Sequence, residues 1–299
     1  AQTWRMEAAR GGRLVRVRGG RSPMSTNSTL QPLNGAARGG AMVPEEGAAR
    51  PGMARLLAFA RRRPVVAATA LVLADLVVVA AAGLAGKLVL PAESQWPDFL
   101  AMCAGILFLV AGLTALGWWR AVGFNRPAHW RKMALLALPA AIFALLPFAR
   151  GARSLDAGTA AFYVVGYALT GFYEEGFFRG IVMRVLRPLG VTRTVFICAA
   201  LFGAAHLVNL LFRNPFIVLA QAVGAFTDGV GLAALRLRTR TLWGVIVLHA
   251  CHDLFLQYTR LPKIPLDVVQ DTIMFFYGLY LLRGLRAVEW TQAGASQTD

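Results

Sequence analysis

The sequence has 299 residues, of which 57% are hydrophobic and 15% are charged, and its formal net charge is +16. A soluble domain usually carries about 25% charged residues, so this composition excludes an ordinary water-soluble protein and favours a chain that lies mostly in lipid. The positive charge lies in an N-terminal tail and in short segments between apolar stretches. This distribution indicates membrane orientation and argues against a nucleic-acid partner.

Residues 1–63 form a basic segment rich in Gly, Arg, Ala and Ser, with twelve arginines and three glutamates. The segment has no sustained apolar period, so we expect it to be disordered. Possible initiators at Met24, Met42 and Met53 indicate that part of this tail is an artefact of gene-start assignment. The arginines that follow Met53 precede the first long apolar stretch, which predicts a signal-anchor that stays attached.

Eight apolar stretches are long enough to cross about 30 Å of hydrocarbon. They lie at residues 64–86, 99–119, 133–149, 158–181, 195–212, 215–235, 241–258 and 265–282. The predicted architecture is therefore an all-α, polytopic membrane protein of about eight transmembrane helices, with a membrane domain at 64–286 and a short polar tail at 287–299. Prolines in the third stretch and acidic residues in the last make these two candidates for re-entrant segments.

The charges of the predicted loops test this order of spans. If the N-terminal tail is cytoplasmic, the loops on its side hold twelve Lys and Arg residues and the loops on the other side hold six. Basic residues concentrate in short cytoplasmic loops, so both termini are predicted to be cytoplasmic. The arginine-rich, lysine-poor composition favours a bacterial inner membrane.

Ionisable side chains inside three of the stretches are the candidates for chemistry, because each one at mid-bilayer costs about 2.5–3.5 kcal/mol. They are Glu174, Glu175 and Arg179 in the fourth stretch, His206 in the fifth, and His249, His252 and Asp253 in the seventh. With a rise of about 1.5 Å per residue, Glu174, His206 and His249 are predicted to lie about 10–17 Å below the cytoplasmic surface. Groups at one depth on different helices are able to converge on one cavity.

Glu174 is the candidate general base. Glu175 and Arg179 are spaced for a helical ion pair in the favoured order, which would neutralise itself. Glu174 points about 100° away from Glu175 and has no basic neighbour at three or four positions. A buried carboxylate that meets an imidazole from another helix is suited to take a proton from water, and His206 is predicted to hold that water.

His249 and Asp253 share one face of the seventh stretch and are candidates for stabilising an oxyanion. An ionised Asp253 has no proton to donate, so Asp253 is either protonated or orients His249. His252 points off this face and is expected to be a packing or rim residue. Asp228, in the sixth stretch, is expected to border the cavity.

Three motifs, in this order, resemble those of the CPBP family, which comprises the CaaX proteases and bacteriocin-processing enzymes and is also called the Abi family. They are Glu-Glu-x-x-x-Arg at 174–179, Phe-x-x-x-His at 202–206 and His-x-x-x-Asp at 249–253. The resemblance covers about 158–258 by motif and about 64–285 by span pattern.

The resemblance implies a glutamic-type intramembrane endopeptidase that needs no cofactor. By it, Glu174 and His206 activate a water and His249 and Asp253 stabilise the oxyanion. Supporting roles fall to Glu175, Arg179 and Phe202. The prenyl-protein endopeptidases of the family have Asn where this chain has Asp253, which weakens a prenyl-protein assignment. We therefore expect a bacterial sorting or peptide-maturation substrate, meaning a membrane-associated protein or peptide.

Two alternatives stay open from the sequence. A zinc-dependent membrane protease would use Glu174, His206 and His249 as ligands, although the chain has no His-Glu-x-x-His helix. A non-catalytic transporter or immunity protein would keep the polar cluster for binding or proton relay, although the chain shows no repeated halves. Membrane lipids are the other expected partners, and the oligomeric state is left open.

Overall fold

The computed structural model describes residues 51–90, 96–127, 129–211 and 213–285. Within these ranges the regular structure is helical, apart from an isolated antiparallel bridge between Ala152 and Thr259. The predicted all-α class is therefore confirmed. The tail at 1–50 and the C-terminal tail at 287–299 lie outside the described residues.

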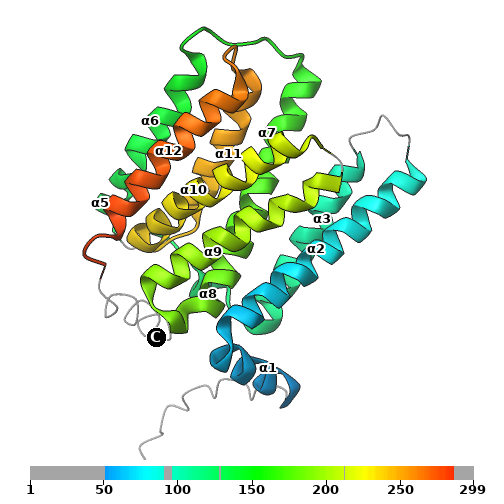
Figure 1. Cartoon of the computed structure of the whole chain (residues 1–299), viewed down its shortest axis with the longest axis vertical. Coiled ribbons are helices and arrows are strands. Elements are labelled where there is room, and N and C mark those ends of the chain that lie inside the picture. Colours follow the sequence, from blue (N-terminus) through cyan, green and yellow to red (C-terminus); the bar gives the residue numbers. More distant parts are fainter. Residues whose placement is uncertain (1–50, 91–95, 128, 212, 286–299) are drawn as a thin grey trace, which may run out of the picture. The chain divides into compact units, whose positions relative to one another are not determined.

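Helices form at all eight predicted stretches (Figure 1). In the first half of the chain these are α2 (Pro64–Val89), α3 (Trp96–Leu116), and a broken third segment of α5 (Trp130–Met133), η1 (Ala134–Leu136), α6 (Ala137–Leu145) and η2 (Leu146–Phe148). The short α4 (Trp119–Val122) lies between α3 and α5. Pro139 and Pro147 lie within this third segment, where they remove backbone donors.

The second half of the chain holds the remaining helices. The fourth segment is α7 (Ala157–Glu174), which continues as the π-helix η3 (Glu175–Val182), then α8 (Met183–Leu186) and η4 (Arg187–Leu189). The fifth is α9 (Val191–Ala205) with the 3₁₀ turns of η5 (His206–Leu211), and the last three are α10 (Pro215–Thr239), α11 (Trp243–Tyr258) and α12 (Lys263–Leu282).

One part of the predicted disordered tail is helical. The helix α1 (Pro51–Arg62) precedes α2, so the prediction of disorder up to residue 63 is wrong for this part. Pro51 is the first residue of this helix, where helices tolerate proline. Arg61 and Arg62 lie in its last turn, where their positive charges interact favourably with the negative end of the helix dipole. Ala60 packs against the hydrophobic core.

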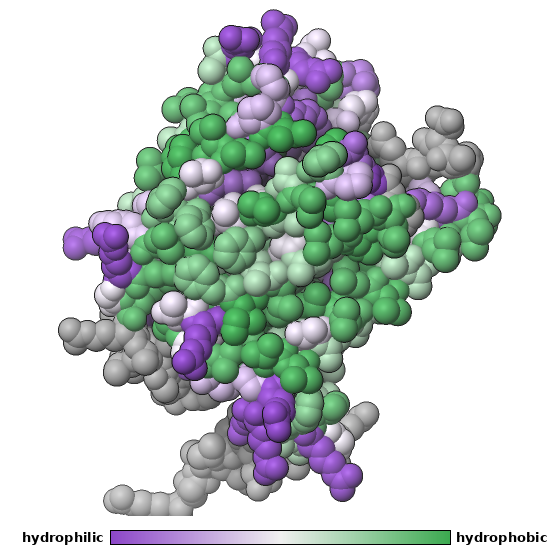
Figure 2. Space-filling model, viewed as in Figure 1, coloured by the Kyte–Doolittle hydropathy of each residue, from purple (hydrophilic) through white to green (hydrophobic). Residues whose placement is uncertain are grey.

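Five helical segments are long and apolar enough to span a membrane, by length and composition. They are Pro64–Val89, Trp96–Leu116, Trp130–Phe148, Val191–Leu211 and Pro215–Thr239. Large apolar side chains on them face outward, as at Leu107, which is 69% exposed, and Figure 2 shows extensive hydrophobic surface. The chain is therefore an integral, polytopic membrane protein. The other three segments, α7–η3, α11 and α12, carry most of the polar groups described below.

The connections gather at two ends of the bundle. At one end, Leu242 donates a backbone hydrogen bond to Gly123, and Arg238 donates to Leu281 at 2.7 Å. At the other end, Arg153 donates through its backbone to Tyr258 at 2.7 Å, and Thr259 donates through its hydroxyl to Pro147 at 2.6 Å. Successive helices therefore run in alternating directions, as the predicted order of spans requires.

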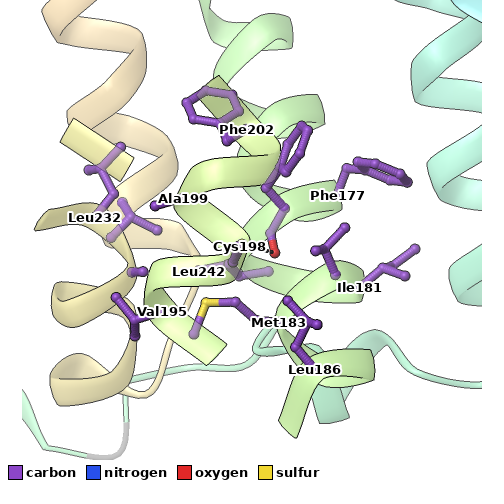
Figure 3. Close-up of a cluster of buried hydrophobic side chains, with 14 of the residues drawn as sticks. Phe177, Ile181, Met183, Leu186, Val195, Cys198, Ala199, Phe202, Leu232 and Leu242 are labelled. Carbon is purple, nitrogen blue, oxygen red and sulfur yellow. Dashed lines mark hydrogen bonds between the residues drawn. The ribbon is translucent and has the colours of Figure 1, made fainter. Parts of the chain in front are cut away.

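The hydrophobic core lies where η3, α8, α9 and α10 meet (Figure 3). Phe177, Phe202 and Leu232 from these elements are all buried. α9 and α10 approach closely at Gly203, where an added Cβ atom would lie 2.5 Å from the carbonyl oxygen of Ala222. This tight packing holds Phe202, and with it the next turn of the chain, in a fixed position.

Candidate active site

A cavity of about 390 Å³ lies among α7, α9, η5, α10, α11 and α12. Its lining includes Glu174, Phe202, His206, His249 and Asp253. Further polar residues line it as well: Tyr167, Thr170, Arg213, Gln221, Asp228, His252, Gln257, Asp267 and Asp271. In Figure 2 a band of hydrophilic surface lies in the upper half of the view, flanked by hydrophobic surface.

Glu175 is fully buried next to the cavity-lining residue His249. Its Oε1 atom lies 2.9 Å from Nη1 of Arg179, and both side chains are fully buried. The same oxygen accepts a hydrogen bond from Nδ1 of His249 at 2.8 Å. The Glu175–Arg179 pair predicted from the spacing is present, and α11 brings a third partner, His249, to it.

Arg179 is held by the aromatic ring of Phe202 as well as by Glu175. Its guanidinium carbon lies 4.2 Å from the ring centroid, a distance at which a cation is attracted to the face of the ring. None of the guanidinium nitrogens forms a hydrogen bond of normal geometry with another described residue. The ion pair and the ring therefore supply the compensation that a buried cation needs.

Glu174, His249 and Asp253 converge in the cavity. Nε2 of His249 lies 3.7 Å from Oε2 of Glu174 and 3.6 Å from Oδ2 of Asp253. The side chain of Glu174 is 22% exposed and that of Asp253 is 28% exposed, whereas His249 is buried. Because Nδ1 of His249 points to Glu175, its Nε2 atom is the one that faces the two cavity carboxylates.

His206 reaches the same cavity from the first turn of η5. Its Nδ1 atom lies 2.8 Å from the carbonyl oxygen of Phe202. A carbonyl only accepts hydrogen bonds, so Nδ1 carries the proton and Nε2 keeps its lone pair when the ring is neutral. Its ring also meets that of Phe202 edge-on, with centroids 4.9 Å apart. These contacts orient the imidazole.

His252 is both a packing residue and part of the cavity lining. Its ring packs against that of Phe143 in a tilted arrangement with centroids 4.3 Å apart, and the residue is buried. Asp228 lines the cavity as expected. Asp267 and Asp271 also line the cavity. Neither belongs to the three motifs, although the acidic residues that set the last apolar stretch apart were a signal of their use.

The cavity continues toward the end of the bundle where the α9–α10 and α11–α12 connections lie. Arg213, Gln257 and Asp267 line it there, and none of these three residues is buried. The predicted span of 195–212 already put His206 nearer to this end than to the opposite one. Because α9 begins at Val191 rather than at 195, His206 lies farther from the start of its segment than predicted and remains close to its end at Leu211.

One group of metal-ligand types is compact among the described residues. The ligand atoms of His252, Asp267 and Asp271 all lie within 4.8 Å of one another. This group differs from the alternative zinc set of Glu174, His206 and His249. His249 in addition uses Nδ1 for its hydrogen bond to Glu175, which leaves Nε2 as its atom on the cavity side.

Comparison with known proteins bears on this part of the chain. Residues 156–255, about a third of the chain, match the family model described as type II CAAX prenyl endopeptidase Rce1-like. No curated protein and no solved structure matches the chain. The matched segment contains Glu174, His206, His249 and Asp253, and it confirms the resemblance to the CPBP family. Residues 156–255 are therefore similar to the CaaX-type membrane proteases of the CPBP family.

Proposed function

We propose that this protease hydrolyses a peptide bond inside the cavity with a water molecule held by Glu174 and His206. The observation that carries the proposal is the convergence of groups from three helix segments on one cavity. Glu174 would accept a proton from the water, and the lone pair of His206 Nε2 would bind and orient that water. The proton on Glu174 would then pass to the leaving amine.

The oxyanion role falls to His249 in this proposal. Its Nδ1–H group donates to Glu175, so an imidazole protonated on both nitrogens is left with an Nε2–H group that points into the cavity. Such a donor stabilises the negative charge that grows on the scissile carbonyl oxygen. Asp253, at 3.6 Å from Nε2, would orient His249 and favour its protonated form, since an ionised carboxylate has no proton to donate.

The substrate proposed is a membrane-associated protein or peptide. Cavity residues Arg213, Gln257 and Asp267 lie toward the end opposite the arginine-rich connections. The distribution of basic residues assigns that end to the non-cytoplasmic side. A peptide that is processed after export, such as a sorting tail or a maturing signal peptide, fits this access better than a cytoplasmic prenylated C-terminus does.

The test compares cells that make the wild-type protein with cells that make Glu174→Gln or His206→Ala at equal membrane levels. Membrane and surface peptides are identified by mass spectrometry. We expect products present with the wild type to be lost with both variants and retained with Asp98→Asn and His129→Ala, since Asp98 and His129 do not line the cavity. Products formed at the normal rate by Glu174→Gln would disprove the mechanism.

A further inference from the structure

A second cluster of polar groups lies in the cavity beside the four candidate catalytic residues. It consists of His252 on α11 with Asp267 and Asp271 on α12, and we call it the acidic annex. Nε2 of His252 lies 3.2 Å from Oδ1 of Asp267, and the three ligand atoms lie within 4.8 Å of one another. The proposed hydrolysis uses none of these three side chains.

One nitrogen of the annex is buried without a hydrogen bond of normal geometry. His252 Nε2 is buried without a hydrogen-bond partner among the described residues, although Asp267 lies close to it. The two atoms therefore approach without the alignment of a hydrogen bond. Ligands of one metal ion show this relation, because each directs its lone pair at the ion and not at the other ligand.

Asp228 provides independent evidence for a ligand. It comes from α10, is 7% exposed and lines the same cavity. Its Oδ1 atom is buried and has no hydrogen-bond partner among the described residues. Buried carboxylate oxygens are ordinarily paired or bound to a cation, so this oxygen, which has no hydrogen bond to a described side chain, is a candidate ligand.

The charges of the annex favour a cation. Asp228, Asp253, Asp267 and Asp271 all lie near enough to His252 to interact with it electrostatically. Four carboxylates thus lie within electrostatic range of one imidazole in a membrane-embedded cavity, and His249 and Arg179 are also within range of Asp228. A divalent ion bound by two of these carboxylates would cancel their charge.

We propose that His252, Asp267 and Asp271 bind one divalent first-row cation of the Zn²⁺ or Mn²⁺ class. Imidazole and carboxylate together suit these ions. Ligands at about 2.0–2.2 Å from one ion lie about 3–4.4 Å from each other, so the observed spacing needs only small side-chain adjustments. Asp228 would complete the site directly or through a water.

The second nitrogen of His252 links this site to the catalytic groups. His252 Nδ1 lies 3.6 Å from Oδ1 of Asp253, whose other oxygen lies 3.6 Å from Nε2 of His249. A carboxylate next to the free nitrogen of a metal-bound histidine orients the ring and makes it a better ligand. The bound ion would therefore position Asp253 between two imidazoles.

The experiment measures binding of Zn²⁺ and of Mn²⁺ to the full chain in detergent, after chelator treatment and dialysis, by calorimetry and by thermal unfolding. We expect about one ion per chain and a Tm that rises with metal concentration. Asp271→Asn and His252→Gln should each weaken binding by about tenfold or more. Asp267→Asn should weaken binding as well, and because this side chain is 38% exposed, the substitution is less able to disturb folding.

Two controls keep the outcome specific. Asp75→Asn changes a buried carboxylate that is bound by Tyr173 outside the annex, and it should bind the ion as the wild type does. Glu174→Gln should also retain binding. The proposal fails if neither ion binds saturably, if Asp267→Asn and Asp271→Asn bind normally, or if Glu174→Gln alone abolishes binding. Because binding is measured directly, failure of the proposed hydrolysis would not affect this result.

Discussion

The carboxylate of Glu175 accepts a hydrogen bond from Nδ1 of His249 at 2.8 Å while it pairs with Arg179 at 2.9 Å. One oxygen thus joins a structural ion pair of the fourth segment to a candidate catalytic imidazole of the seventh. The neighbouring residue, Glu174, is partly exposed to the cavity. The two adjacent glutamates therefore lie in different environments, Glu175 in a buried ion pair and Glu174 facing the cavity. Substitution of each should give a different result.

Glu175→Gln should lower stability. The substitution keeps the side-chain volume but leaves the buried guanidinium of Arg179 without its counter-charge, and breaking a buried pair in this way costs about 3–5 kcal/mol. Thermal unfolding in detergent measures the effect. An unchanged Tm would mean that the ring of Phe202 and the surrounding dipoles compensate Arg179 without the carboxylate.

Glu174→Gln should instead lower the rate with little change in Tm. An amide does not accept the proton of the attacking water, and loss of a general base typically costs about 10²–10⁴ in rate. The Glu175→Gln protein is the matched comparison, because both variants remove one charge from adjacent positions. Equal losses of Tm in the two proteins would contradict the division of roles between them.

Tyr173→Phe should destabilise the contact between α7 and α2. The Tyr173 hydroxyl donates to Oδ2 of Asp75 at 2.5 Å, and Oδ1 of Asp75 is already buried without a partner. Loss of the donor leaves the carboxylate unsatisfied, at a cost of about 1–3 kcal/mol. Tyr280→Phe, at a residue that is 62% exposed, is the control and should unfold at the wild-type temperature.

Gly203→Ala should separate α9 from α10. The new Cβ atom would lie 2.5 Å from the Ala222 carbonyl oxygen and 3.2 Å from Cβ of Phe226. Neither atom is the end of a flexible side chain, so the backbones must move, at a cost of about 1–3 kcal/mol. Gly166→Ala has open space around it and should be neutral or stabilising. The prediction fails if both variants unfold at one temperature.

Asp156 should make the start of α7 sensitive to acid. Its Oδ1 accepts a hydrogen bond from the backbone nitrogen of Thr159 at 2.9 Å, and hydrogen bonding with Thr159 lowers the pKa of Asp156 below its ordinary value of 3.8. A depressed pKa in the folded state stabilises the protein above the unfolded-state pKa, and this stability disappears as the pH falls through the folded-state pKa.

The measurement is Tm against pH for the wild type and Asp156→Asn. Asn is also a good helix cap but does not titrate, so the difference between the two proteins isolates the charge of Asp156. The Tm of the wild type relative to that of Asp156→Asn should be constant near neutral pH and should fall below about pH 4. A difference that stays constant throughout would exclude a role for the ionised cap.

Helix positions were accessible from the sequence because a membrane helix needs a long apolar stretch, whose signal does not depend on its neighbours. The motifs around Glu174, His206 and His249 were equally visible, since an ionisable side chain stands out among apolar residues. The sequence does not determine how each helix is rotated about its own axis. A helix that is apolar on all sides carries little information about which face meets a neighbour.

Tertiary packing decided the rest. The contact of Glu175 with His249 depends on how η3 and α11 face each other, and local spacing showed only the pair with Arg179. Asp267 and Asp271 enter the cavity because α12 packs on α10, where Gly231 and Gly278 bring the two backbones together. Local sequence therefore determined the helices and the polar groups available. Long-range packing determined which of those groups share a cavity, because distances between helices are set by contacts far apart in the chain.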